Sequence, residues 1–342
     1  RSVAIGEIAK FVIFPGHRVD IAMRFKPDVR LIVKVKERNS AIGGGVGLKP
    51  SRGRISFAPM VDENGYGLAQ NFVQVKSVRD AAALLDCLAK PQPGDPFVIP
   101  RPAEPWAVVA RKAAPKLRIG WTTAPLMGLT TDPEVAAAVV ATAKALEGMG
   151  HIVEESDPVL GGMEAMRGMS DAWFFGFDLR LEGYSRRSGH KIGRDTLEPV
   201  TYAIYEYARA MKPAQFVAAM SALNATRRRL GAFYTRHDVM LSPTTFRPAE
   251  PWGNYNLGRT DVTMETIIEK VFRGTCQYTL PHNIMGTPAM SLPLAMTSSG
   301  LPIGITLAGK PSEEHVVLQL AIALETAMPW ADRVPPLHVT RS

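Results

Sequence analysis

A glycine-rich loop brings together the residue types that nucleophilic catalysis needs. In residues 43–56, three consecutive glycines precede Lys49, Ser51 and two arginines, and Ser40 lies just before the glycines. A serine hydroxyl, a base that removes its proton and backbone amides that stabilise an oxyanion would together cleave an acyl bond. The same kind of loop can bind phosphate, but no Gly-Lys-Ser or Gly-Lys-Thr sequence follows the glycines. We therefore predict no phosphate-binding loop here.

His282 is the second residue whose type suits catalysis. Together with Ser242 or Ser291 it could form a Ser-His-Asp arrangement. Neither serine lies in a sequence typical of a nucleophile, so we expect His282 to be structural or to form part of a pocket wall. The sequence has no His-Glu-x-x-His or Cys-x-x-Cys motif and no cluster of carboxylates, so we expect no metal site.

Alternating strands and helices are expected to position these residues. Asp132 followed by a proline marks a helix start between two short apolar strands, which is typical of parallel pairing in an α/β sheet. Ser77, with an acid three residues later, marks another helix start. The expected strands are 117–120, 152–154, 238–244, 289–294 and 303–307, and the expected helices are 77–88, 133–149, 213–236 and one that begins at 312.

The composition is that of an ordinary globular protein with enough apolar residues for a core. Of the 342 residues, 46% are hydrophobic and 21% are charged, and no window of about 18 uninterrupted apolar residues indicates a membrane span. Two cysteines, Cys87 and Cys276, exclude a disulfide framework, so the reducing cytoplasm is the expected location. We expect Cys87 to lie on the apolar side of its helix, as a core thiol.

The net charge of +8 is concentrated near the N-terminus. Residues 1–43 carry nine basic and four acidic side chains, with few capping or turn signals. We interpret this segment as an aberrant basic leader, because a nucleic-acid-binding surface would need aromatic or helical context. The three consecutive arginines Arg227, Arg228 and Arg229 lie on the long predicted helix, where we expect a solvated face or an interface.

Four segments of the chain resemble blocks of the amidase signature family, in the order in which that family has them. They are the loop 44–56, the strand 238–244, the Asn-Ile-Met-Gly-Thr-Pro-Ala-Met-Ser-Leu-Pro segment 283–293 and the turn 300–304. Residues 77–96 are most similar to the branch of the family that contains 6-aminohexanoate-cyclic-dimer hydrolase and related bacterial amidases. Because the four blocks together span most of the chain, the resemblance is specific.

The resemblance implies an α/β fold in which a mixed central sheet is flanked by helices. It also implies hydrolysis of carbon–nitrogen bonds in linear or cyclic carboxamides, without a cofactor. In the family a serine attacks the carbonyl, a second serine in a cis peptide relays the proton, and a neutral lysine is the base. The expected substrate-binding residues are Thr275, Cys276, Tyr278 and Asn283, with core packing as the alternative for the first three.

The catalytic residues of the family have no counterparts at the expected positions of this sequence. Counting back from Gly47 places the nucleophile position at Val35, and the Gly-Gly-Ser-Ser-Gly-Gly loop that holds the second serine is absent. Ser40 has the wrong spacing and no flanking glycine, and Lys49 stands at a position that is structural in the family. We therefore assign no catalytic residue.

We expect two parts in the chain. Residues 1–43 form the leader without family resemblance, and residues 44–342 form the C-terminal portion of a single amidase-signature domain whose N-terminal strands and helices are missing. Such a chain is expected to be inactive alone; the alternative is a non-catalytic pseudo-amidase that serves as a binding or interaction module. The expected partner is a small-molecule amide, with no nucleic acid and no membrane. Exposed apolar edges would favour homo-oligomers.

Overall fold

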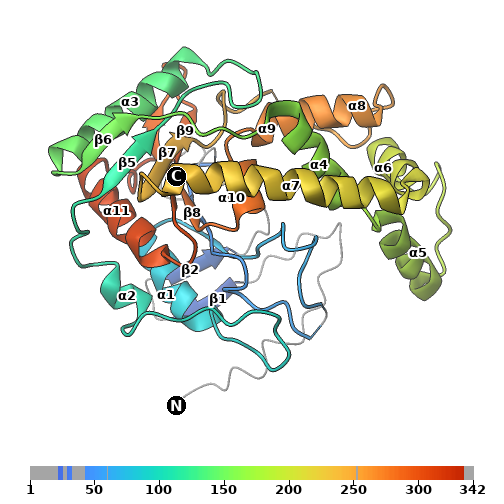
Figure 1. Cartoon of the computed structure of the whole chain (residues 1–342), viewed down its shortest axis with the longest axis horizontal. Coiled ribbons are helices and arrows are strands. Elements are labelled where there is room, and N and C mark those ends of the chain that lie inside the picture. The colour runs from blue at the N-terminus through green and yellow to red at the C-terminus, as the bar shows by residue number, and fades with distance from the viewer. Residues whose placement is uncertain (1–21, 26–28, 33–42, 60, 252, 335–342) are drawn as a thin grey trace, which may run out of the picture.

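A seven-stranded mixed sheet forms the centre of the computed structural model, which describes residues 22–25, 29–32, 43–59, 61–251 and 253–334. The strand order is β4-β3-β8-β9-β7-β5-β6 (Figure 1). Strand β5 runs parallel to β6 and β7, and the other neighbouring strands are antiparallel. The strands are β3 (Val46–Lys49), β4 (Gln74–Val75), β5 (Arg118–Trp121), β6 (Ile152–Glu155), β7 (Val239–Pro243), β8 (Ala289–Met296) and β9 (Pro302–Gly309).

A separate antiparallel pair is described near the N-terminus. It consists of β1 (Ala22–Phe25) and β2 (Val29–Ile32). The other residues of the segment 1–42, Val35 and Ser40 among them, lie outside the described residues. The interpretation of residues 1–43 as a leader therefore stays a prediction.

One face of the sheet is covered by helices that bury a large apolar core. These helices are α1 (Val78–Leu88), α2 (Trp106–Val109), α3 (Pro133–Gly148) and α11 (Glu314–Ala327). Because side chains alternate along a strand, Val239 and Leu241 of β7 point into this core, whereas Met240 between them points to the other face. Burial of such alternating apolar side chains fixes the strand register.

The opposite face carries a second apolar core and the predicted site residues. Its helices are α4 (Gly162–Phe174), α7 (Pro213–Tyr234), the π-helix η3 (Ile268–Arg273), α9 (Gly274–Cys276) and α10 (Leu280–Met285), with the short α8 (Met264–Ile267) ahead of η3. Met166 and Met169 of α4 are buried in this core. Their helical spacing therefore reflects core packing.

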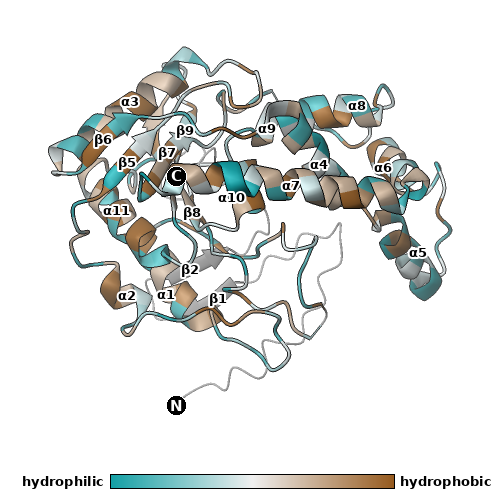
Figure 2. Cartoon of the chain, in the orientation of Figure 1, coloured by the Kyte–Doolittle hydropathy of each residue, from teal (hydrophilic) through white to brown (hydrophobic). Residues whose placement is uncertain are grey.

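Helices α5 (Phe177–Ser188) and α6 (Pro199–Ala210) lie beyond the sheet, at the far end of α7 (Figure 1). None of the residues of α5 is buried. Figure 2 shows that the sheet and this region differ in hydropathy, because the central strands are largely hydrophobic and the tip of α5 is hydrophilic. These two helices form an arm, of which α5 adds no buried residue to the cores and α6 adds Val200 to the second core.

The sequence signals for helix starts are confirmed. The Ser77 side chain accepts a hydrogen bond from the Asp80 N–H (3.2 Å), and the Asp132 side chain caps α3. The expectation for Cys87 was wrong, because this residue is exposed. The buried arc of α1 runs through Val78, Ala81 and Leu85, and Cys87 falls about 180° away from Val78 on the helix. No helix in the described part of the chain is long and apolar enough to cross a bilayer.

Candidate functional site

The glycine-rich loop leaves β3 and is held in place by a buried ion pair. Glu314, at the start of α11, is fully buried and accepts hydrogen bonds from the Ser51 N–H (3.0 Å) and from two guanidinium nitrogens of Arg54 (3.0 Å each). Burial alone would raise the pKa of Glu314, but the Arg54 guanidinium and the Ser51 N–H outweigh it and hold the pKa below its usual value. These contacts therefore tie the loop to the start of α11.

A second anchor joins this loop to the C-terminal end of α10. Arg52 donates to the carbonyl oxygens of Gly67 (2.6 Å), Asn283 (2.9 Å) and Ile284 (3.2 Å). Arg227 of α7 donates to the same Ile284 oxygen at 2.8 Å. Carbonyl groups at the end of a helix lack partners within the helix and carry its negative partial charge, so cations there are stabilising.

The charge of Arg227 also affects the pKa of Arg52. Burial, followed by the nearby charge of Arg227, lowers the pKa of Arg52. The prediction for the three consecutive arginines was a solvated face or an interface: Arg228 and Arg229 are exposed, whereas Arg227 is half-buried where α7 contacts α10. Sequence periodicity alone could not reveal this, because the partner of Arg227 is a backbone carbonyl far away in the chain.

Of the predicted substrate-binding residues, Thr275 and Cys276 lie on α9, Asn283 lies on α10, and Tyr278 lies in the turn between these helices. The thiol of Cys276 is 3.2 Å from the Thr275 hydroxyl, and Cys276 is buried in the core beneath α4 and α7. Asn283 donates through Nδ2 to the carbonyl oxygen of Leu68 (2.7 Å). The structure thus brings Thr275 and Cys276 together and gives Asn283 a role in holding the loop before β4; a role in binding substrate stays a prediction.

Tyr278 has a structural contact at the carboxyl end of β5. Its hydroxyl lies 2.9 Å from the carbonyl oxygen of Thr123 and 2.7 Å from that of Ala124, and it also bonds to the Thr131 hydroxyl. Burial raises the pKa of Tyr278 to about 12, so its proton stays in place at neutral pH. The ring is 1% exposed. In this arrangement Tyr278 packs in the core, which was the alternative considered for it.

His282 does not form a triad with either candidate serine. The Ser242 hydroxyl donates to the carbonyl oxygen of Pro243, and the Ser291 hydroxyl bonds to Thr244. Burial, and then the charge of Lys49, lower the pKa of His282 to about 3, so the imidazole is neutral and a poor proton acceptor. Its Nε2 has no hydrogen-bond partner among the described residues. Lys49 itself donates to the carbonyl oxygen of Pro50 (3.1 Å), which fits support of the loop.

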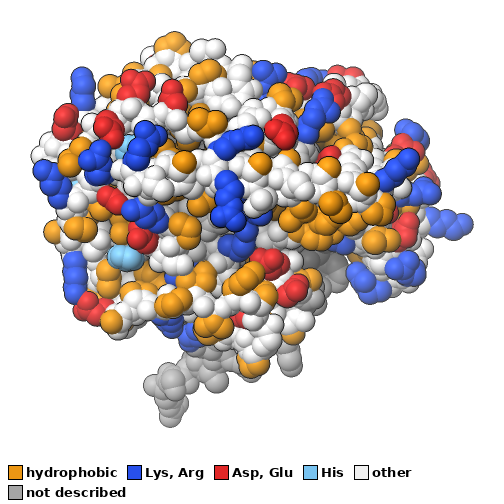
Figure 3. Space-filling view, viewed as in Figure 1, with side chains coloured by type: hydrophobic (Ala, Val, Ile, Leu, Met, Phe, Trp, Pro, Cys, Tyr) orange, Lys and Arg blue, Asp and Glu red, His pale blue; other side chains and the backbone are white. Residues whose placement is uncertain are grey.

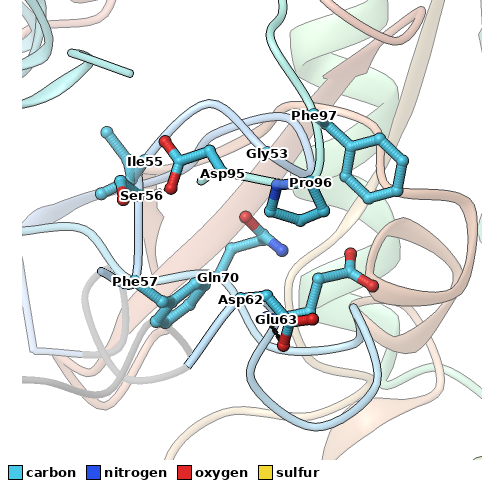
Figure 4. A pocket seen from close by; sticks show the side chains of 10 residues that line it. All are labelled: Gly53, Ile55, Ser56, Phe57, Asp62, Glu63, Gln70, Asp95, Pro96 and Phe97. Carbon is cyan, nitrogen blue, oxygen red and sulfur yellow. Dashed lines mark hydrogen bonds between the residues drawn. The ribbon is translucent and has the colours of Figure 1, made fainter. Parts of the chain in front are cut away.

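A small cavity lies between the glycine-rich loop and residues 95–97 (Figure 4). Asp95 accepts hydrogen bonds there from the Ser56 hydroxyl (2.6 Å) and the Gln92 N–H (2.7 Å), and the Gln70 amide lies in the middle of the lining residues. Its volume of about 10 Å³ suits a single water molecule and not an amide substrate. The described residues contain no group of three or more His, Cys, Asp or Glu that could hold a metal ion.

Comparison with known proteins identifies the family. The family model described as Amidase matches residues 40–318, and the chain belongs to this family. It is 33% identical over 311 residues to a 6-aminohexanoate-cyclic-dimer hydrolase of Paenarthrobacter ureafaciens and 32% identical over 309 residues to that of Pseudomonas sp. strain NK87. Each alignment covers 87% of this chain and 62% of the relative, so the chain spans less than two thirds of these proteins.

Solved structures agree with this assignment. A 6-aminohexanoate cyclic dimer hydrolase complexed with substrate superposes with a TM-score of 0.81 at 30% identity, over 89% of this chain and 65% of the other. A bacterial aryl acylamidase of the amidase signature family has a TM-score of 0.72 at 18% identity, over 86% of this chain and 62% of the other, which supports the fold alone. The expected fold and family are therefore confirmed.

Proposed function

We propose that this chain forms the substrate-binding side of an amide hydrolase that cleaves the carbon–nitrogen bond of linear or cyclic carboxamides. The observation that carries the proposal is the likeness to a 6-aminohexanoate cyclic dimer hydrolase, which extends over 89% of this chain. The loop 50–56, anchored by Glu314 and Arg52, supports it further, because in the family this loop follows the nucleophile.

We further propose that bond cleavage needs residues that this chain does not contain. The motif position of the nucleophile holds Val35, and the neutral, buried His282 has no serine as a hydrogen-bond partner among the described residues. The chain is then inactive alone, with residues 44–342 as the C-terminal portion of one amidase domain. The proposed compartment is the cytoplasm, supported by two cysteines that form no disulfide.

A chimera tests this function. Residues 1–43 are replaced by the N-terminal region of the Paenarthrobacter relative up to its own glycine-rich loop, and release of amine from a set of linear and cyclic carboxamides is measured. We expect turnover by the chimera. A matched chimera in which the relative's nucleophilic serine is changed to alanine should be inactive. A folded chimera that binds an amide and never cleaves it would instead support the non-catalytic pseudo-amidase.

A further inference from the structure

A second cavity in the described part of the chain lies near the predicted substrate-binding residues, because Lys270 in its lining belongs to η3, which leads into α9 and Cys276. It has a volume of about 190 Å³ and is lined by Arg247, Glu250, Asn254, Tyr255, Arg259 and Lys270. Most of these residues follow the carboxyl end of β7, which is parallel to β5, and ligands of α/β proteins commonly bind at such ends. A water molecule occupies about 30 Å³ in the liquid, so the cavity has room for a small charged group with bound water.

The cavity carries an excess of positive charge. Glu250 forms an ion pair with Arg247 through Oε1 and accepts a hydrogen bond from Asn254 through Oε2 (2.9 Å). Arg259 pairs with Asp261 through both carboxylate oxygens. Lys270 has no ion pair within 4 Å of a described carboxylate, and its charge acts on the nearby Asp261, whose pKa it helps to lower. Three cations line the cavity, and the carboxylates of Glu250 in the lining and of Asp261 beside it offset two of them, which leaves an excess of one positive charge.

Tyr255 connects the cavity to the predicted site. Burial raises the pKa of its hydroxyl, with smaller opposing contributions from the charges of Arg247 and Cys276, so both side chains lie near it. A tyrosine that keeps its proton can donate a hydrogen bond to an anion. Lys270 lies on η3, which leads directly into α9 and Cys276.

We propose that this cavity binds a carboxylate group of the substrate, so that the chain selects amides that also carry a free carboxylate. This inference rests on the proposed function and narrows its substrate class. A single surplus positive charge matches a carboxylate better than a phosphate group, which carries nearly two negative charges at neutral pH. A cyclic dimer of 6-aminohexanoate, named for the relatives, has no free carboxylate, so the preferred substrate of this chain would be a linear amide.

Calorimetric titration of the whole chain tests the inference with two matched probes. The first is N-acetyl-6-aminohexanoate and the second is its neutral N-methylamide, so that the two differ at the carboxylate. We expect the anionic probe to bind about five- to tenfold more tightly, as a charge-assisted hydrogen bond allows, and this preference should shrink as the salt concentration rises. Lys270→Met should remove most of the preference and leave the binding of the neutral probe unchanged.

Lys144→Met is the matched control, because Lys144 is exposed on α3, outside the cavity. Equal binding of the two probes, or an equal effect of the two lysine variants, would overturn the inference and leave the proposed amide site intact. Failure of both probes to bind would overturn the inference as well, while the chimera assay still decides the proposed function. Tighter binding of inorganic phosphate than of the carboxylate probe would contradict the assignment to a carboxylate.

Discussion

At the scale of single residues, the Arg54–Glu314 ion pair stabilises the fold more than the sequence around either residue suggests. Both side chains are buried, and Glu314 also accepts a hydrogen bond from the Ser51 N–H. Removing one partner of such a pair leaves an uncompensated charge in the interior, which costs about 3–5 kcal/mol. The loop 50–56 would lose its fixed position at the same time.

We therefore expect Glu314→Gln to lower the free energy of unfolding by about 3–5 kcal/mol in urea titrations. The matched control is Glu313→Gln, one residue earlier, where no ion pair exists among the described residues and the loss should stay below about 1 kcal/mol. Equal effects of the two substitutions would show that the pair does not anchor the loop.

The lowered pKa of His282 predicts that the stability of the folded chain depends on pH. Its pKa is lowered to about 3 in the folded chain, whereas an unfolded histidine titrates near pH 6.5. Between these values the unfolded chain binds the additional proton, so stability is fully present above about pH 6.5 and decreases as the pH falls.

The slope from this residue should approach about 1.4 kcal/mol per pH unit between about pH 6 and pH 4. Urea titrations of the wild type and of His282→Gln across this range measure it. The variant should lose this part of the slope, whatever its stability at pH 7. An unchanged slope in the variant would mean that His282 is protonated in the folded chain.

At the scale of elements, the parts with local signals were predictable and the parts with distant partners were not. The capping residues Ser77 and Asp132 predicted the starts of α1 and α3. Short apolar runs predicted the strands β5, β6 and β7. The contact of Arg227 could not be predicted, because its acceptor, the carbonyl oxygen of Ile284, belongs to a different helix. The π-helix η3 also carries no local signal, since its hydrogen bonds differ from those of an α-helix by one residue.

At the scale of elements, the contact of Arg227 with α10 predicts how substitutions on α7 change the stability of the chain. Arg227→Gln removes a charge-assisted hydrogen bond from the end of α10, and we expect a loss of about 1–2 kcal/mol, reduced by relief of the repulsion with Arg52. Arg228→Gln, on the exposed side of α7, should change stability by less than about 0.5 kcal/mol. Chemical denaturation of both variants provides the comparison, and a larger loss for Arg228→Gln would contradict the assigned contact.

At the scale of the whole molecule, the described sheet ends in two short edge strands, β4 and β6. Exposed edges and apolar surface favour association between chains. Figure 3 shows hydrophobic side chains gathered along α7 toward the arm, where Val217 is 63% exposed, and Leu179 on α5 is 65% exposed. We therefore expect the purified chain to form homo-oligomers or aggregates. Light scattering coupled to size-exclusion chromatography measures this, and a monodisperse monomer with a sharp cooperative melt would argue against it.

We propose that this chain retains the binding side of an amidase without the residues that break the bond. The most direct measurement is amine release from a simple linear carboxamide by the 342-residue chain itself, followed over hours against buffer. We predict no release above the buffer rate. Sustained turnover that a single serine-to-alanine substitution within the chain abolishes would contradict the claim, because a nucleophile would then be present.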